Sequence, residues 1–267
     1  MSTKLPSKTM HISLNGWRVT HIVGIFTGLA LITVKFRLNH LLPRNCVLCD
    51  TDCAGAIDLC EHCLPTLAWN THCCSRCALP ISSAYPACPA CSTFDFDCAV
   101  VPLRFETEVA RLVQRLKFNN GRVEARILGQ ILLAAVTARY ANARWPELIV
   151  PVPLSATRLR RRGYNQAILL ASQIARKHRI PIIRHAIRRR HRPPQQTLTA
   201  AERATNLVGS FTTTRTFGGT LAIVDDVLTT GATVNELSRL LLARGASEIH
   251  VWCAARAPLE AIARGEV

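Results

Sequence analysis

The segment at residues 221–233, LAIVDDVLTTGAT, limits the possible folds more than any other part of this chain. It begins with an apolar run rich in β-branched residues, which is typical of a buried strand in a parallel sheet. Two adjacent acids, a Thr/Gly turn and apolar residues at helical spacing from 234 to 241 follow. This order of strand, loop and helix predicts an open α/β sheet that binds its ligand at the carboxyl end of the strand.

The loop in this segment has the composition of a phosphate site. Backbone N–H groups at the start of a helix point toward an anion, and glycine lets the backbone approach it closely. Asp225 and Asp226 only accept hydrogen bonds when ionised, so they suit sugar hydroxyls or hydrated Mg²⁺. Together the loop and the acids predict a site for a ribose 5-phosphate. The residues expected to bind the phosphate are Thr229, Thr230, Gly231, Ala232 and Thr233.

These 13 residues also resemble the signature of type I phosphoribosyltransferases, which bind phosphoribosyl pyrophosphate. The competing interpretation is an ordinary Rossmann-like turn with two incidental acids. The resemblance is favoured because the acid pair, the threonines and the glycine all coincide within one short segment.

Four C-x-x-C pairs repeat with a 14-residue period, and they account for eight of the 12 cysteines. Two such pairs can complete a tetrahedral Zn²⁺ site, so four pairs predict two closed, structural sites. Sequential pairing is favoured over interleaved pairing because a helix can start at the second pair, and a cluster of disulfides is the alternative to zinc. The expected zinc ligands are Cys46, Cys49, Cys60, Cys63, Cys74, Cys77, Cys88 and Cys91.

The net charge of +16 is carried almost entirely by the second part of the chain. Residues 1–100 contain 7 Lys/Arg and 6 Asp/Glu, whereas residues 151–192 contain 12 Lys/Arg and no acid. A solvated basic face is the simpler interpretation of such a run. The complete absence of acids favours binding of an anion, such as pyrophosphate or nucleic acid.

A second strand is expected at residues 148–153, followed by an arginine-rich loop that includes Arg162. Because parallel strands end at the same edge of a sheet, this loop is expected beside the ribose phosphate site. Arginine suits a pyrophosphate group. Lys117, at the end of a helix through residues 109–116, is a further candidate, and residues 188–198 are expected to form a mobile loop that closes over the site.

The first 40 residues are expected to be an extension outside the folded core. An apolar run at 22–34 is too short to span a bilayer, so no stable membrane span is expected. A signal-peptide core, a weak membrane-surface anchor, and a start codon assigned too far upstream are the alternatives for this stretch. The expected domains are a zinc-ribbon module at 41–97 and an α/β domain at 98–267.

From about residue 41 to residue 256 the chain resembles the ComF family, also called GntX-like. The resemblance rests on the four cysteine pairs, on Leu116, Lys117 and Phe118, on the runs PVPL at 151–154 and RGYNQ at 162–166, and on the 221–233 segment. One departure is Ala78, at a position where glycine commonly follows the cysteine pair.

The resemblance implies a type I phosphoribosyltransferase fold, with a Rossmann-like parallel sheet and an N-terminal double zinc ribbon. It also implies a cytoplasmic protein of natural transformation, with single-stranded DNA and competence machinery proteins as candidate partners. Three functions stay open at this point: phosphoribosyl transfer, non-catalytic binding of single-stranded nucleic acid, and sensing of phosphoribosyl pyrophosphate. For transfer, Mg²⁺ is the expected cofactor, and the candidate catalytic residues are Asp225, Asp226, Arg162 and Lys117.

Overall fold

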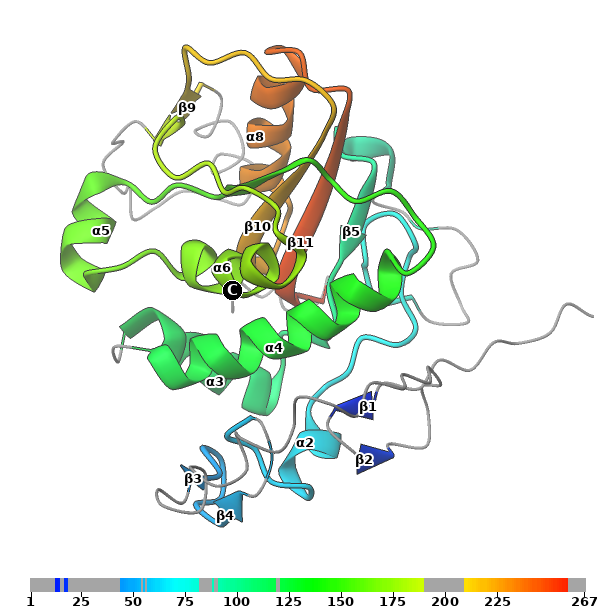
Figure 1. Cartoon of the computed structure of the whole chain (residues 1–267), viewed down its shortest axis with the longest axis vertical. Coiled ribbons are helices and arrows are strands. Elements are labelled where there is room, and N and C mark those ends of the chain that lie inside the picture. The colour runs from blue at the N-terminus through cyan, green and yellow to red at the C-terminus, as the bar shows by residue number, and fades with distance from the viewer. Residues whose placement is uncertain are drawn as a thin grey trace, which may run out of the picture. The chain divides into compact units, whose positions relative to one another are not determined.

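The computed structural model describes residues 13–14, 17–18, 44–53, 55, 57–81, 88, 91–118, 121–189 and 209–258. The chain divides into two compact units, residues 1–67 and residues 68–267, whose elements are labelled in Figure 1. Within the described residues, no helix combines the length and the apolar character needed to cross a bilayer. The apolar run at 22–34 lies outside the described residues.

The first unit contains short elements only. Strands β1 (Ser13–Leu14) and β2 (Trp17–Arg18) form one antiparallel pair, and β3 (Arg44–Asn45) and β4 (Asp52–Cys53) form another. Helix α2 (Cys63–Thr66) begins at the second cysteine pair, as the sequence predicts.

The second unit is built on a parallel sheet with the strand order β5-β11-β10-β7. Its strands are β5 (Cys98–Val100), β7 (Leu148–Pro151), β10 (Thr220–Leu228) and β11 (Glu248–Arg256), and β6 (Leu103–Arg104) also pairs with β11. Figure 1 shows β10 and β11 side by side at the centre, and both strands are almost entirely buried. The predicted α/β fold with a parallel sheet is confirmed.

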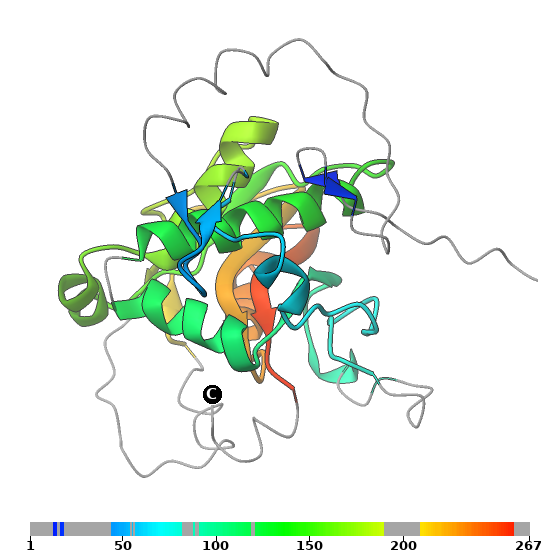
Figure 2. The ribbon, with the colours of Figure 1, turned by 90° about the horizontal axis from the view of Figure 1, so that it is seen from below.

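Helices cover both faces of this sheet. Alternate residues of a strand point to opposite faces, and the buried strands therefore present apolar side chains on both sides. Leu221 and Ile223 of β10 share a hydrophobic cluster with α8 (Ala232–Leu242). On the other face, Trp252 of β11 contacts Tyr140 at the end of α4 (Arg122–Arg139). In Figure 2 the green helices α3 (Thr107–Phe118) and α4 lie in front of the orange and red strands β10 and β11.

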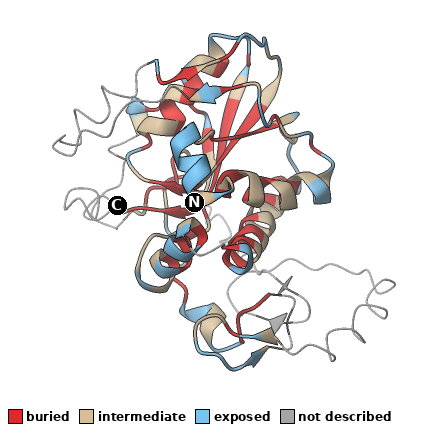
Figure 3. Ribbon diagram, turned by 90° about the vertical axis from the view of Figure 1, so that its left-hand side faces the viewer, coloured by how far each residue is buried: buried red, intermediate tan, exposed pale blue. Residues whose placement is uncertain are grey.

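The arginine-rich segment after β7 is a helix and not the loop expected from the sequence. Ser155 caps α5 (Ala156–Arg162) by accepting a hydrogen bond from the Arg158 N–H at 3.4 Å, and Gly163 ends the helix in the left-handed region at φ 77°. Almost every residue of α5 is exposed, as the colouring by burial in Figure 3 conveys, so no apolar periodicity marked the helix in the sequence. Helix α6 (Gln166–His178) follows, and Asn165 caps it.

The remaining elements are short. A 3₁₀ turn, η1 (Cys91–Thr93), precedes β5, and β8 (Arg188–Arg189) pairs antiparallel with β9 (Phe211–Thr212). Strand β8 covers the first two residues of the closing loop predicted at 188–198, and the rest of that loop lies outside the described residues.

A buried polar network joins α4 to the amino-terminal end of β11. The Trp252 indole donates to the Tyr140 hydroxyl at 3.3 Å, and that hydroxyl lies 2.6 Å from His250 Nδ1. His250 Nε2 lies 2.9 Å from Glu248 Oε1, which favours the tautomer in which Tyr140 donates to the imidazole. Burial raises the pKa of Tyr140, so the hydroxyl keeps its proton at physiological pH.

We predict that Tyr140→Phe lowers the free energy of unfolding by about 1 to 3 kcal/mol, because it leaves two buried polar atoms without this partner. Urea denaturation measures the change, and an unchanged m-value would show that the native state is still compact. Equal midpoints for the variant and the parent protein would contradict the network's contribution to stability.

Candidate functional site

The two adjacent acids lie within β10, two residues before the strand ends at Leu228. The sequence predicted that the strand ends at the acids, and it continues because Val227 and Leu228 pair with Ala255 and Arg256 of β11. Asp225 Oδ1 accepts a hydrogen bond from the Asp226 N–H at 2.9 Å, and Asp226 Oδ1 accepts one from the Val227 N–H at 3.0 Å. Both carboxylates are therefore held by backbone donors.

A lysine from α3 reaches the second acid. Lys117 Nζ lies 3.3 Å from Asp226 Oδ2, an ion-pair distance without the alignment of a hydrogen bond. Asp226 is only 7% exposed, and its Oδ2 has no hydrogen-bond partner among the described residues. A carboxylate oxygen in this position can accept a hydrogen bond from a ligand or coordinate a cation.

Two arginines interact electrostatically with the acid pair. Burial lowers the pKa of Arg162, and the attraction of Asp226 partly opposes this effect. Burial also lowers the pKa of Arg189 in β8, where Asp225 is the opposing charge. The Nε atom of Arg162 is buried and has no hydrogen-bond partner in the described part of the chain. The sequence predicts a role for Arg162 but not for Arg189, because nothing local to β8 indicates that the charge of Arg189 acts on Asp225.

The acid pair itself is under electrostatic strain. Burial, and then the neighbouring charge of Asp226, raise the pKa of Asp225, while Lys117 acts in the opposite direction. Asp225 is only partly buried, so solvent reduces the energetic cost of its negative charge. Two acids that repel each other while cations surround them are a common feature of binding and catalytic sites.

The loop after β10 has the form of an anion site. Gly231 is the N-cap of α8 and has φ 81°, a backbone conformation that favours glycine. A Cβ atom at this position would also overlap the ring of Phe94. The first turn of α8 leaves backbone N–H groups without partners inside the helix, and such groups bind phosphate.

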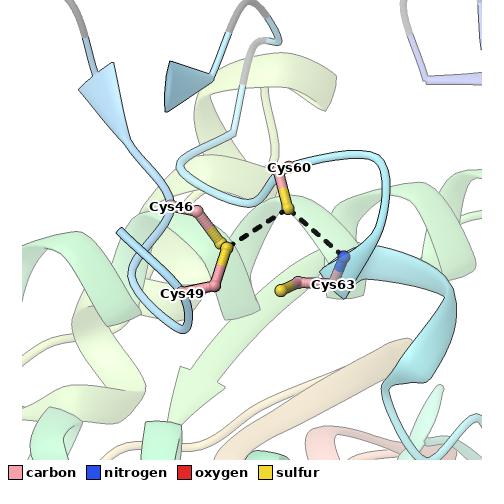
Figure 4. A group of neighbouring side chains, drawn as sticks. All are labelled: Cys46, Cys49, Cys60 and Cys63. Carbon is pink, nitrogen blue, oxygen red and sulfur yellow. Dashed lines mark hydrogen bonds between the residues drawn. The ribbon is translucent and has the colours of Figure 1, made fainter. Parts of the chain in front are cut away.

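The cysteines form two groups that follow the sequential pairing. In each group the four Sγ atoms all lie within 4.8 Å of one another. Zn–S bonds of about 2.3 Å in a tetrahedron require S–S separations of about 3.8 Å. Cys49 and Cys60 have Sγ atoms 3.6 Å apart (Figure 4), and Cys77 and Cys88 have Sγ atoms 3.4 Å apart. Both groups therefore bring four sulfur atoms close enough together for one Zn²⁺ ion each, and every described cysteine is a free thiol.

Comparison with known proteins gives two family matches. The double zinc ribbon domain matches residues 37–92, and the phosphoribosyl transferase domain matches residues 160–263. The first match contains both cysteine groups, which supports their assignment as structural zinc sites. The second match contains the acid pair and the loop after β10.

The similar proteins are named for competence or for the use of DNA. The chain is 36% identical to Competence protein F of Haemophilus influenzae, over 74% of this chain and 84% of that protein. It is 32% identical to DNA utilization protein YhgH of Escherichia coli, over 80% of this chain and 98% of that protein. A shorter match at 32% identity, to Competence protein ComFC of Bacillus subtilis, covers 37% of this chain and 39% of that protein.

The raised pKa of Asp225 predicts a stabilising substitution. Its folded-state pKa lies above the unfolded value of about 3.9. Ionising this residue therefore costs folded-state stability, and the cost grows as the pH rises from the unfolded pKa to the folded one. We expect Asp225→Asn to raise the free energy of unfolding at neutral pH by on the order of 1 kcal/mol.

Urea denaturation at about pH 5 and about pH 8 measures this effect, and the gain should be larger at the higher pH. Asp226→Asn is the matched control. It removes a charge from the same pair but also breaks the ion pair with Lys117, so its gain should be smaller. If Asp225→Asn matches the parent protein at both pH values, the carboxylate is not strained.

Proposed function

We propose a ligand for this chain on the premise that it belongs to the ComF family of proteins with a double zinc ribbon and a phosphoribosyltransferase domain. The ligand is phosphoribosyl pyrophosphate together with Mg²⁺. The observation that carries the proposal is that β10 holds two acids two residues before it ends in the loop that starts α8, with Lys117 Nζ 3.3 Å from the second acid. One short segment offers acceptors for the ribose hydroxyls and donors for the phosphate, and α3 adds a cation beside it. This combination matches the chemistry of the substrate.

Each group has a distinct task in this proposal. The N–H groups of residues 229–233 bind the 5-phosphate, and Asp225 and Asp226 accept hydrogen bonds from the ribose hydroxyls. Lys117 pairs with Asp226, and Arg162 interacts with it electrostatically, so both cations can hold the pyrophosphate. The oxygen atoms of the acid pair, including Asp226 Oδ2, which accepts no hydrogen bond from the described residues, suit Mg²⁺. When bound, Mg²⁺ would supply further positive charge for the pyrophosphate.

We infer further that the protein transfers the phosphoribosyl group. In that reaction the bond from C1 of the ribose to pyrophosphate breaks, negative charge grows on the leaving oxygen, and an acceptor nitrogen forms the new bond. Lys117 and Arg162 stabilise the departing charge in this scheme, because preorganised cations act most strongly where charge develops.

An acceptor screen tests the transfer reaction. The full chain is incubated with phosphoribosyl pyrophosphate, Mg²⁺ and a panel of purines, pyrimidines and nicotinic-type acids, and released pyrophosphate is measured. Release with one acceptor class supports transfer. Tight binding without release for any acceptor would contradict transfer and favour a protein that senses phosphoribosyl pyrophosphate.

For substrate binding, we predict that Asp226→Ala weakens the affinity for phosphoribosyl pyrophosphate with Mg²⁺ by at least about 100-fold. Two charge-assisted hydrogen bonds to the ribose contribute about 1.5 to 3 kcal/mol each, which converts to this factor or more in Kd. Isothermal titration calorimetry measures it. Glu108→Ala in α3 is the control, because Glu108 pairs with Arg111 on the surface and should leave Kd unchanged. Equal Kd values for both variants would contradict the placement of the ribose.

We also propose a role in handling single-stranded DNA during uptake, in the cytoplasm. The names of the relatives motivate this role, and an exposed aromatic residue supports it. Phe118, at the end of α3, is 63% exposed, and the guanidinium groups of Arg161 and Arg162 lie 5.8 and 5.5 Å from its ring centroid. An exposed ring flanked by arginines suits base stacking beside a phosphate backbone. Reduced thiols in the cytoplasm are also compatible with the two zinc groups.

We predict that Phe118→Ala weakens binding of a single-stranded oligonucleotide by about tenfold without changing its salt dependence, because stacking carries no charge. Arg161→Gln should instead make the plot of log K against log salt less steep, by about one unit. Fluorescence anisotropy at several salt concentrations measures both effects. Asp225→Ala, expected to lose phosphoribosyl pyrophosphate, should still bind the oligonucleotide. Unchanged affinity in Phe118→Ala would contradict this surface.

A further inference from the structure

We infer that the second cysteine group, Cys74, Cys77, Cys88 and Cys91, positions the anion-binding loop after β10, and that Arg256 is the positioning residue that connects them. The second group belongs to the same compact unit as β10, and its buried cysteines share one hydrophobic cluster with α8. The structural part of this inference concerns the free protein. Its consequence for ligand affinity rests on the proposed binding of phosphoribosyl pyrophosphate.

Arg256, the last residue of β11, links the cysteine group to the loop directly. Its side chain is 1% exposed, and its Nε donates to the Cys77 carbonyl at 3.3 Å. Its Nη1 donates to the Leu228 carbonyl at 2.8 Å and also to the Thr229 carbonyl. One rigid guanidinium group therefore holds the backbone of a cysteine pair and the backbone of the loop at a fixed separation.

These contacts also set the direction in which the loop presents its N–H groups. A trans peptide unit is planar, and its C=O and N–H bonds point to opposite sides. When Arg256 binds the carbonyls of Leu228 and Thr229, the N–H groups of Thr229 and Thr230 must point away from the guanidinium. That is the side on which an anion can be bound, so Arg256 orients two of the proposed phosphate donors without touching the phosphate.

A second connection runs from the last cysteine to the start of α8. Thr93 and Asp95 follow Cys91 closely in the chain, and both bind the side chain of Asn235 in α8. Asn235 Oδ1 accepts from the Asp95 N–H, and its Nδ2 donates to the Thr93 carbonyl at 3.2 Å. Phe94, between these two residues, occupies the space where Gly231 lacks a side chain. The loop and the first turn of α8 are thus held from two sides.

The charge of the metal site favours the same arrangement. A buried guanidinium group is costly unless nearby groups compensate its charge. Its four hydrogen bonds in the described structure all go to backbone carbonyls, which are neutral. Four thiolates around Zn²⁺ carry a net negative charge, and Cys77 of that group is in contact with Arg256 through its carbonyl. Metal in the second group should therefore stabilise Arg256 in its buried position.

Hydrogen exchange of the full chain, read by mass spectrometry, tests the inference without any ligand. We expect Cys91→Ser to lose one of two bound zinc ions and to speed the exchange of peptides covering 229–241 by about tenfold. Cys63→Ser is the matched control, because Cys63 is also a partly buried fourth ligand but belongs to the first group and the other unit. It should lose one zinc ion and leave the exchange of 229–241 unchanged.

Arg256→Lys keeps the charge but cannot bind several carbonyls in a fixed geometry. It should keep both zinc ions, speed the exchange of 229–241 and weaken binding of phosphoribosyl pyrophosphate with Mg²⁺ by about tenfold. This variant decides the matter if Cys91→Ser does not fold. Unchanged exchange in Arg256→Lys, or in a folded Cys91→Ser, would overturn the inference. If exchange changes as expected but the parent protein binds no phosphoribosyl pyrophosphate, the proposed function fails and the positioning role stands.

Discussion

The parallel pairing of β10 with a strand on each side is the constraint on which the site depends. Pairing with β7 fixes residues 221–224, and pairing with β11 continues to the end of the strand, where Leu228 lies opposite Arg256. Pairing with β11 holds the part of the strand that carries the two acids, and the extended backbone there points neighbouring side chains to opposite faces of the sheet. The same register brings Arg256 to the start of the loop. The sheet therefore determines both the position of the acids and the support of the loop.

The electrostatics of the site oppose stability and favour binding. Asp225 and Asp226 repel each other, and burial penalises the charges of Arg162 and Arg189 as well. Lys117 offsets part of this cost through its ion pair with Asp226. Charges that are already desolvated and fixed need little reorganisation when a ligand arrives, which is how preorganised sites gain affinity and rate. A site of this kind is expected to lower the stability of the folded protein, and the surrounding sheet offsets that loss.

Local features of the site could be predicted from the sequence, and contacts between distant segments could not. The strand, the loop and the cysteine groups each lie within a short segment, and the spacing of residues in such a segment indicates its local structure. The approach of Lys117 to Asp226 depends on the packing of α3, and the contacts of Arg256 depend on the register of β11 with β10. Helix α5 cannot be predicted from an apolar period, because almost all of its residues are exposed. Ala78 stands where glycine is common, and the structure shows why glycine suits this position, since the φ of 54° lies in the left-handed region.

Alanine at position 78 is tolerable because two effects of similar size oppose each other. The left-handed conformation costs about 1 to 2 kcal/mol for a residue with a Cβ atom. Ala78 is buried, and its methyl group recovers about 0.8 kcal/mol through the hydrophobic effect. Its carbonyl also accepts a hydrogen bond from the buried Asn70 side chain at 2.9 Å, which favours this one backbone orientation. The turn after Cys77 thus keeps its shape without glycine, as it must if the carbonyl of Cys77 is to meet Arg256.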